Sequence, residues 1–236
     1  AGPGLPARRG AGRDMDGMVV GMQRSSWTAV RRWRHGLRAS GLALLIAIAS
    51  FAPAGHARAQ SAVLKERLAR GINLGHWFAQ TFQEFSYEEA ERYITPEQVE
   101  ALAAAGFRHV RLPVALERSF AETEDGARFR TVLIDKIRLL NAHRLAVVLD
   151  IHPTDEEKRR IDETRTQGTF ARGWSLLAKE LSVISPDDLA LEVMNEPFPL
   201  KGQVWATLQD EAAQAIRAAA PQHTIVLNPG NWSSLE

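Results

Sequence analysis

The chain has 236 residues, of which 45% are hydrophobic and 24% are charged, and it contains no cysteine. Its length fits one or two globular domains, and its composition argues against wholesale disorder, collagen-like repeats and a disulfide framework. The lack of cysteine also excludes thiolate metal sites and cysteine nucleophiles. The net charge of +1 combines two unlike segments: residues 1–59 hold nine arginines and two aspartates, whereas residues 60–236 hold 20 basic and 26 acidic side chains. The basic total therefore gives no support to nucleic-acid binding, and we expect no nucleic-acid partner.

Residues 1–59 have the features of a secretory leader. An arginine-rich stretch over residues 24–38 precedes 12 uncharged residues, 41–52, and Ala57-Arg58-Ala59 then matches a small-residue cleavage site. A membrane anchor is the alternative, but about 20 apolar residues are needed to span a bilayer. We therefore expect a signal peptide removed after residue 59, export to the periplasm or the extracellular space, and no stable membrane span after cleavage.

The first residues of this leader have a separate origin in our interpretation. Residues 1–14 begin with alanine and are rich in glycine, proline and arginine, without periodicity. We interpret them as upstream sequence, with Met15, Met18 and Met22 as candidates for the true start.

Residues 60–236 alternate short apolar runs, typical of strands, with amphipathic helical patterns. The predicted strands cover residues 71–74, 109–112, 146–151, 189–195 and 224–228. The predicted helices cover residues 95–106, 130–142, 169–184 and 203–219. The first helix opens with Thr-Pro-Glu-Gln, the pattern of a capping box. This alternation predicts an α/β fold with a parallel sheet.

Two parallel architectures are open, a doubly wound sheet and a (β/α)8 TIM barrel. No glycine-rich dinucleotide fingerprint follows the first strand, which argues against a Rossmann-type domain. Polar residues instead gather where the predicted strands end, at Asn73, Arg111, Asp150, His152, Asn195, Glu196 and Asn228. Because barrels build their active sites at the carboxyl ends of their strands, we favour the barrel.

The sharpest motif is Leu-Glu-Val-Met-Asn-Glu-Pro over residues 191–197. The strand period of two predicts that Glu192, Met194 and Glu196 share one side, with Glu192 deeper and Glu196 at the rim. A solvated carboxylate at a strand end is the alternative interpretation of Glu196.

Five segments follow one another at similar spacing: residues 70–75, 106–113, 147–152, 191–197 and 224–232. In their order and spacing they resemble the family 5 glycoside hydrolases, the cellulase-like (β/α)8 enzymes. The resemblance covers about residues 66–236.

The resemblance implies a retaining mechanism, in which one carboxylate protonates the leaving oxygen and another attacks the anomeric carbon. By resemblance Glu196 is the general acid/base and Asn195 forms a hydrogen bond with the sugar 2-hydroxyl. Arg111 orients the nucleophile, although a core ion pair is the alternative, and His152 lines the sugar subsite. Asp150 is interpreted as a buried hydrogen-bond partner. No metal ion and no organic cofactor are implied.

Aromatic side chains at the predicted rim suggest stacking on sugar rings. We expect Trp77 and Trp232 to contact the substrate, with ordinary packing as the alternative. Further aromatic residues nearby are Phe78, Phe82, Phe85 and Phe198.

The resemblance places the nucleophile on strand seven, and no residue of this chain corresponds to it. Glu192 is rejected as a substitute because it lies below the rim. We therefore expect residues 60–236 to form a barrel truncated after about strand five, which neither folds stably alone nor hydrolyses substrate.

The leading hypothesis is an exported enzyme that hydrolyses a β-linked polysaccharide, with β-1,4-glucan as the first substrate and β-1,3-glucan or β-mannan as alternatives. We expect a monomer when the protein is full length. The second hypothesis is a non-catalytic glycan-binding remnant, and a weaker third is an unrelated barrel such as a sugar-phosphate enzyme. Genomic sequence beyond codon 236 discriminates the first two, because an in-frame strand-seven glutamate restores the enzyme.

Overall fold

A computed structural model of the chain describes residues 62–164, 167–200 and 202–230. The predicted signal peptide and Trp232 lie outside these residues. The strands are β1 (Gly71–Asn73), β2 (His109–Val114), β3 (Ala146–Ile151), β4 (Leu189–Glu192) and β5 (Thr224–Val226). The helices are α2 (Tyr87–Arg92), α3 (Pro96–Ala104), α4 (Leu116–Phe120), α5 (Glu124–Ala142), α6 (Asp155–Thr164), α7 (Thr169–Leu181) and α8 (Gly202–Ala219).

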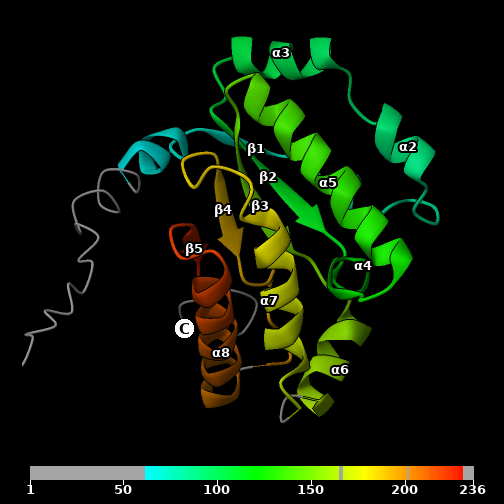
Figure 1. Cartoon of the computed structure of the whole chain (residues 1–236), viewed down its shortest axis with the longest axis vertical. Coiled ribbons are helices and arrows are strands. Elements are labelled where there is room, and N and C mark those ends of the chain that lie inside the picture. The colour runs from blue at the N-terminus through cyan, green and yellow to red at the C-terminus, as the bar shows by residue number, and fades with distance from the viewer. Residues whose placement is uncertain (1–61, 165–166, 201, 231–236) are drawn as a thin grey trace, which may run out of the picture. The chain divides into compact units, whose positions relative to one another are not determined.

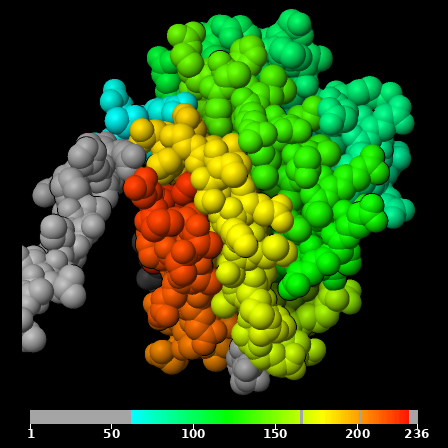
Figure 2. Space-filling model, in the orientation of Figure 1, coloured from blue at the N-terminus to red at the C-terminus, as the bar shows by residue number. Residues whose placement is uncertain are grey.

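The five strands form one sheet in the order β1-β2-β3-β4-β5, and every neighbouring pair is parallel. A doubly wound sheet reverses direction at a switch point, so its strand order is not the order of the chain. Sequential order is that of a barrel wall, which favours the predicted barrel over the doubly wound alternative. Helices α5, α7 and α8 lie over the same face of the sheet (Figure 1), and α7 packs closely along α8 (Figure 2).

The pleat of the central strand divides the core into two parts. Val147, Leu149 and Ile151 of β3 join the main core with the helices, and all three are fully buried. Ala146 and Val148 face the other side, where they contact Leu64 from a helical turn over residues 62–67. The outer face therefore packs large aliphatic groups against helices, whereas the inner face carries small groups and leaves room for polar side chains.

The predicted capping box at the start of α3 is confirmed. The Thr95 hydroxyl accepts a hydrogen bond from the Gln98 backbone N–H, and the Gln98 side chain accepts one from the Thr95 N–H. Two backbone donors that the helix cannot satisfy internally are thereby paired.

Several helix boundaries differ from the prediction. Helix α5 begins at Glu124, six residues before the predicted start, behind Thr123 as N-cap. Its early turn requires Gly126, because a Cβ there would lie 2.4 Å from the Ala121 carbonyl oxygen. Helices α2, α4 and α6 were not predicted, because they are short or carry few apolar residues.

The fourth strand is shorter than predicted, ending at Glu192 rather than at residue 195. Glu196 has a left-handed backbone with φ of 42° and does not belong to the strand. The prediction that Glu192, Met194 and Glu196 share one side by strand period is therefore wrong, because that period requires extended backbone and the strand ends at Glu192. Met194 packs into the main core instead.

Among the helices of the described residues, none combines the length and the apolar character that crossing a bilayer requires.

Candidate active site

A buried charge cluster occupies the inner face of the sheet. Asp150 and Glu192 are register partners on β3 and β4, so their carboxylates project side by side, and they are 0% and 5% exposed. Arg111 on β2 meets Glu192 with two hydrogen bonds of 2.8 Å, from Nε to Oε2 and from Nη2 to Oε1. Its Nη2 also lies 2.9 Å from Asp150 Oδ2. One guanidinium thus compensates two carboxylates that would be costly to bury unpaired.

The pKa directions agree with this arrangement. Burial raises the pKa of Asp150, the hydrogen bond from His152 opposes that rise, and the charge of Glu192 reinforces it. Burial alone would lower the pKa of Arg111, but the hydrogen bond to Glu192 and the charges of Asp150 and Glu192 raise it overall. The guanidinium therefore stays charged.

Three of the predicted site residues, His152, Asn195 and Arg111, are connected with Asp150 in one chain of hydrogen bonds. Asp150 Oδ2 lies 2.7 Å from His152 Nδ1. His152 Nε2 lies 3.3 Å from Asn195 Nδ2, and Asn195 Oδ1 accepts from Arg111 Nη2 at 3.1 Å. We call Asp150, His152, Asn195, Arg111 and Glu192 the Arg111 network. Arg111 therefore makes the core ion pair that was the alternative interpretation, and it contacts Asn195 as well.

Asn228 also joins this cluster, although it was not predicted as a site residue. Its side-chain Nδ2 donates to Glu192 Oε1 at 3.0 Å. Its backbone is held from two sides, because Trp205 Nε1 donates to its carbonyl at 2.7 Å and its N–H donates to Gln209 Oε1 at 2.7 Å. Its place two residues after β5, at the end of the predicted strand, was the signal in the sequence. With Arg111 and Asn228 on its oxygens, Glu192 has a structural role.

Glu196 lies next to Asn195 and is exposed to solvent. Its charge contributes to the raised pKa of Arg111, which places the carboxylate within electrostatic reach of the network. Its carbonyl accepts a hydrogen bond from the Phe198 N–H at 2.7 Å. A left-handed backbone costs a non-glycine residue about 1–3 kcal/mol, and such strain clusters at functional sites.

The structure places Trp77 in the packing interior, as the alternative interpretation of this residue expected, and its contact with substrate stays a prediction. Trp77 is 1% exposed, its Nε1 donates to the Ala90 carbonyl at 2.9 Å, and its ring stacks on Tyr93 at 4.9 Å. The loop after β1 turns this indole beneath α2 rather than toward solvent. Phe82 is instead 86% exposed, and its ring stacks on His76 with centroids 4.2 Å apart.

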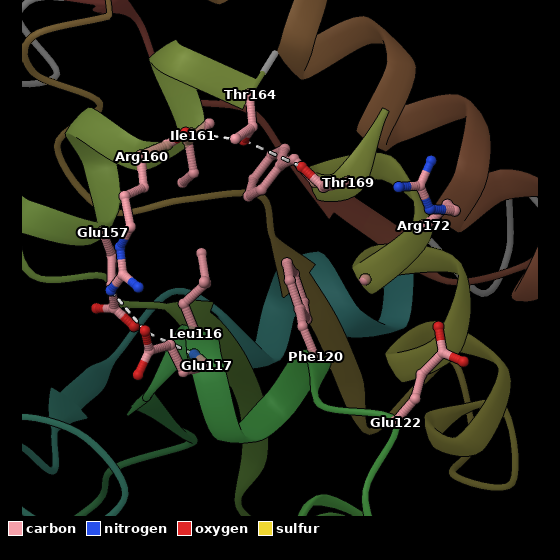
Figure 3. A pocket seen from close by; sticks show the side chains of 12 residues that line it. Leu116, Glu117, Phe120, Glu122, Glu157, Arg160, Ile161, Thr164, Thr169 and Arg172 are labelled. Carbon is pink, nitrogen blue, oxygen red and sulfur yellow. Dashed lines mark hydrogen bonds and ion pairs between the residues drawn. The ribbon is translucent and has the colours of Figure 1, made fainter. Parts of the chain in front are cut away.

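Two cavities lie apart from the Arg111 network. One, of about 490 Å³, lies between the loop after β1 and α2, where Phe82 and Tyr93 are among its lining residues. The other, of about 410 Å³, lies between α4, α6 and α7 (Figure 3). Its apolar wall includes Phe120 and Phe170, and the ion pair of Arg160 with Glu117 stands at its edge. Among the described residues that line either cavity, none belongs to the network.

No group of three or more histidine, aspartate or glutamate side chains is arranged to hold a metal ion within the described part of the chain. The site offers a charged network with two buried carboxylates and a solvent-exposed carboxylate at its rim. Such an arrangement suits proton transfer to a bound ligand.

The chain is similar to proteins of one family over most of its length. The family model described as "Cellulase (glycosyl hydrolase family 5)" matches residues 74–235. Endoglucanase C of Acetivibrio thermocellus is 30% identical over 178 residues, which cover 70% of this chain and 50% of that protein. Cellodextrinase A of Ruminococcus flavefaciens is 28% identical over 179 residues, covering 70% of this chain and 52% of that protein. The chain thus spans about half the length of the curated relatives it matches.

Solved structures show the same likeness. Thermotoga maritima Cel5A in complex with cellobiose is 26% identical, with a TM-score of 0.61 over 72% of this chain and 55% of that one. The same enzyme in complex with mannotriose gives a TM-score of 0.60 at 26% identity, over 72% of this chain and 56% of that one. These likenesses confirm the (β/α)8 barrel fold, of which the present structure contains strands β1 to β5.

Proposed function

This chain belongs to glycosyl hydrolase family 5, and from that premise we propose that the whole protein hydrolyses the β-1,4-glycosidic bonds of a cellulose-type glucan. One observation carries the assignment to this site. Glu196 is an exposed carboxylate directly after Asn195, and Asn195 is held by its hydrogen bonds with Arg111 and His152. A proton donor must be accessible, whereas the groups that orient the sugar must be rigid.

We propose a retaining double displacement with Glu196 as the general acid/base. Glu196 first gives its proton to the leaving glycosidic oxygen, and it then removes a proton from the water that hydrolyses the glycosyl-enzyme intermediate. Asn195 donates to the sugar 2-hydroxyl, a contact that strengthens in the transition state. His152 lines the same subsite.

The nucleophile in this proposal is a second carboxylate about 5–5.5 Å from Glu196. Asp150 and Glu192 are unsuited to this task because both are buried and bonded within the Arg111 network. We assign the nucleophile to a glutamate on strand seven of the whole protein.

The names of the relatives support the choice of substrate. They include endoglucanases and a cellodextrinase, and the Thermotoga maritima enzyme was solved with cellobiose and with mannotriose. We therefore rank β-1,4-glucan first and β-mannan second, with β-1,3-glucan third.

We also propose that the leader over residues 1–59 exports the protein to the periplasm or outside the cell, and that the full-length protein is a monomer.

The test expresses the complete reading frame, including any codons that follow 236, and measures reducing ends released from the three polysaccharides. We expect hydrolysis of β-1,4-glucan, with the β-anomer as first product by NMR, and a loss of at least about 100-fold in kcat for Glu196→Gln. The matched control is Glu163→Gln, an exposed glutamate of α6. Activity that survives Glu196→Gln, or an inverted anomer, refutes the mechanism. Binding without hydrolysis by the complete protein supports the glycan-binding remnant instead.

A further inference from the structure

The hydrogen-bond roles within the Arg111 network can be assigned from chemistry alone, beginning at the guanidinium. An arginine side chain only donates hydrogen bonds. Asn195 must therefore present its oxygen to Arg111 Nη2, at 3.1 Å, which turns its Nδ2 toward His152. The amide orientation of Asn195 thus follows from Arg111.

The same reasoning continues to the imidazole. Asn195 Nδ2 only donates, and it lies 3.3 Å from His152 Nε2, so that ring nitrogen must be an acceptor without a proton. A neutral imidazole with a bare Nε2 carries its proton on Nδ1. This Nδ1 faces Asp150 Oδ2 at 2.7 Å.

Asp150 ends the chain as an acceptor. Its Oδ2 receives the His152 Nδ1–H, and it also forms an ion pair with Arg111 Nη2, 2.9 Å away. Its Oδ1 is buried without a hydrogen-bond partner among the described residues, and the residue as a whole is 0% exposed. Because any proton on this carboxyl would occupy Oδ1, Oδ2 accepts from His152 in either charge state.

We propose that Asp150 is a positioning residue that holds His152 as the Nδ1–H tautomer and thereby fixes the direction in which Asn195 donates. The proposal rests on the proposed function in one respect, namely that the second Nδ2 hydrogen of Asn195 serves the substrate. With Oδ1 on Arg111 and one Nδ2 hydrogen on His152, that second hydrogen is the remaining donor of the amide. Asn195 is partly exposed and precedes Glu196, so this donor lies beside the proposed acid/base.

The alternative tautomer explains why the carboxylate matters. If the His152 proton were on Nε2, it would face the Asn195 amide N–H, donor against donor. The Asn195 amide would have to rotate by half a turn to avoid this clash between two donors. Its Nδ2 would then face the guanidinium of Arg111, which can only donate. An acceptor oxygen at Asp150 keeps the proton on Nδ1 of His152, so this clash does not arise. A neutral acceptor oxygen is sufficient for this role.

The experiment measures ring 15N shifts of His152 at neutral pH in the complete protein, with His152→Gln used to identify its resonances among those of the other histidines. We expect a protonated Nδ1 and a bare Nε2. Asp150→Asn should preserve this pattern, because its amide oxygen can replace Oδ2. Asp150→Ala should lose it. In the active full-length protein, Asp150→Ala should lower kcat about 10- to 100-fold, with a smaller change in KM, whereas Asp150→Asn should stay within about tenfold.

Asn195→Asp provides a second variant if Asp150→Ala does not fold. Its carboxylate oxygen replaces the amide donor beside Nε2, so His152 should gain a second proton. The proposal is overturned if His152 of the wild-type protein is protonated at Nε2. It is also overturned if a folded Asp150→Ala variant keeps the Nδ1–H tautomer, or if Asn195→Asp leaves Nε2 without a proton. The 15N shifts can be measured without any catalytic activity. A protein that shows the expected His152 tautomer but hydrolyses no glycan would therefore refute the proposed function, whereas the proposed role of Asp150 would still hold.

Discussion

Removal of Arg111 is the sharpest test of how the site is held together. In Arg111→Met, the carboxylates of Asp150 and Glu192 remain side by side, 0% and 5% exposed, without their shared cation. Breaking a buried ion pair by removing one partner costs about 3–5 kcal/mol, because an uncompensated charge stays buried. We expect a loss of free energy of unfolding in that range, which is a large part of the stability of an ordinary domain.

The loss should depend on pH in a defined direction. Burial already raises the pKa of Asp150, and removing the charge of Arg111 raises it further. A carboxyl whose pKa is higher in the folded than in the unfolded state destabilises the fold once the unfolded chain can ionise. The penalty of Arg111→Met should therefore be smallest below about pH 4 and should grow as the pH rises toward neutrality.

Urea unfolding of the complete protein at several pH values measures both effects. The matched control is Arg92→Met, which removes the exposed pair with Glu88 and should cost less than about 1 kcal/mol. Arg111→Met combined with Glu192→Met should recover part of the loss, because no second carboxylate then remains beside Asp150. A single Arg111→Met variant as stable as the Arg92→Met control would refute the compensation argument.

Three further predictions concern other parts of the fold. Phe82→Ala should raise KM for glucan severalfold with little change in kcat, because Phe82 is 86% exposed, and an equal effect of the exposed control Val183→Ala would contradict a substrate contact. Thr95→Ala should cost about 1 kcal/mol in urea unfolding, since it removes the cap of α3, and a neutral result would contradict the capping account. Burial lowers the pKa of His223, so the folded state binds fewer protons there; stability should fall as the pH drops below about 6.5, and His223→Gln should flatten that slope.

Local patterns in the sequence predicted the five strands and the helices α3, α5, α7 and α8, although several of their ends shifted. Helix α6 shows where a usable signal was overlooked. Thr154 and Glu157 form a capping box, with hydrogen bonds of 3.2 Å and 2.6 Å between each side chain and the other residue's N–H. The same Thr-x-x-Glu pattern is readable in the sequence, and only the scarcity of apolar residues in this segment argued against a helix.

The sequence by itself determined which strands end in polar residues and which family they resemble, because residue type and spacing carry that information along the chain. It could not separate Trp77 from Phe82, since both follow β1 and only packing decides that one indole lies beneath α2 while one phenyl ring remains in solvent. Nor could it show that Arg111 bridges Asp150 and Glu192, because these residues come from three strands whose register is set by the assembled sheet. Only the tertiary structure shows this bridge, because the two carboxylates become buried, and need a compensating cation, only when the three strands lie side by side.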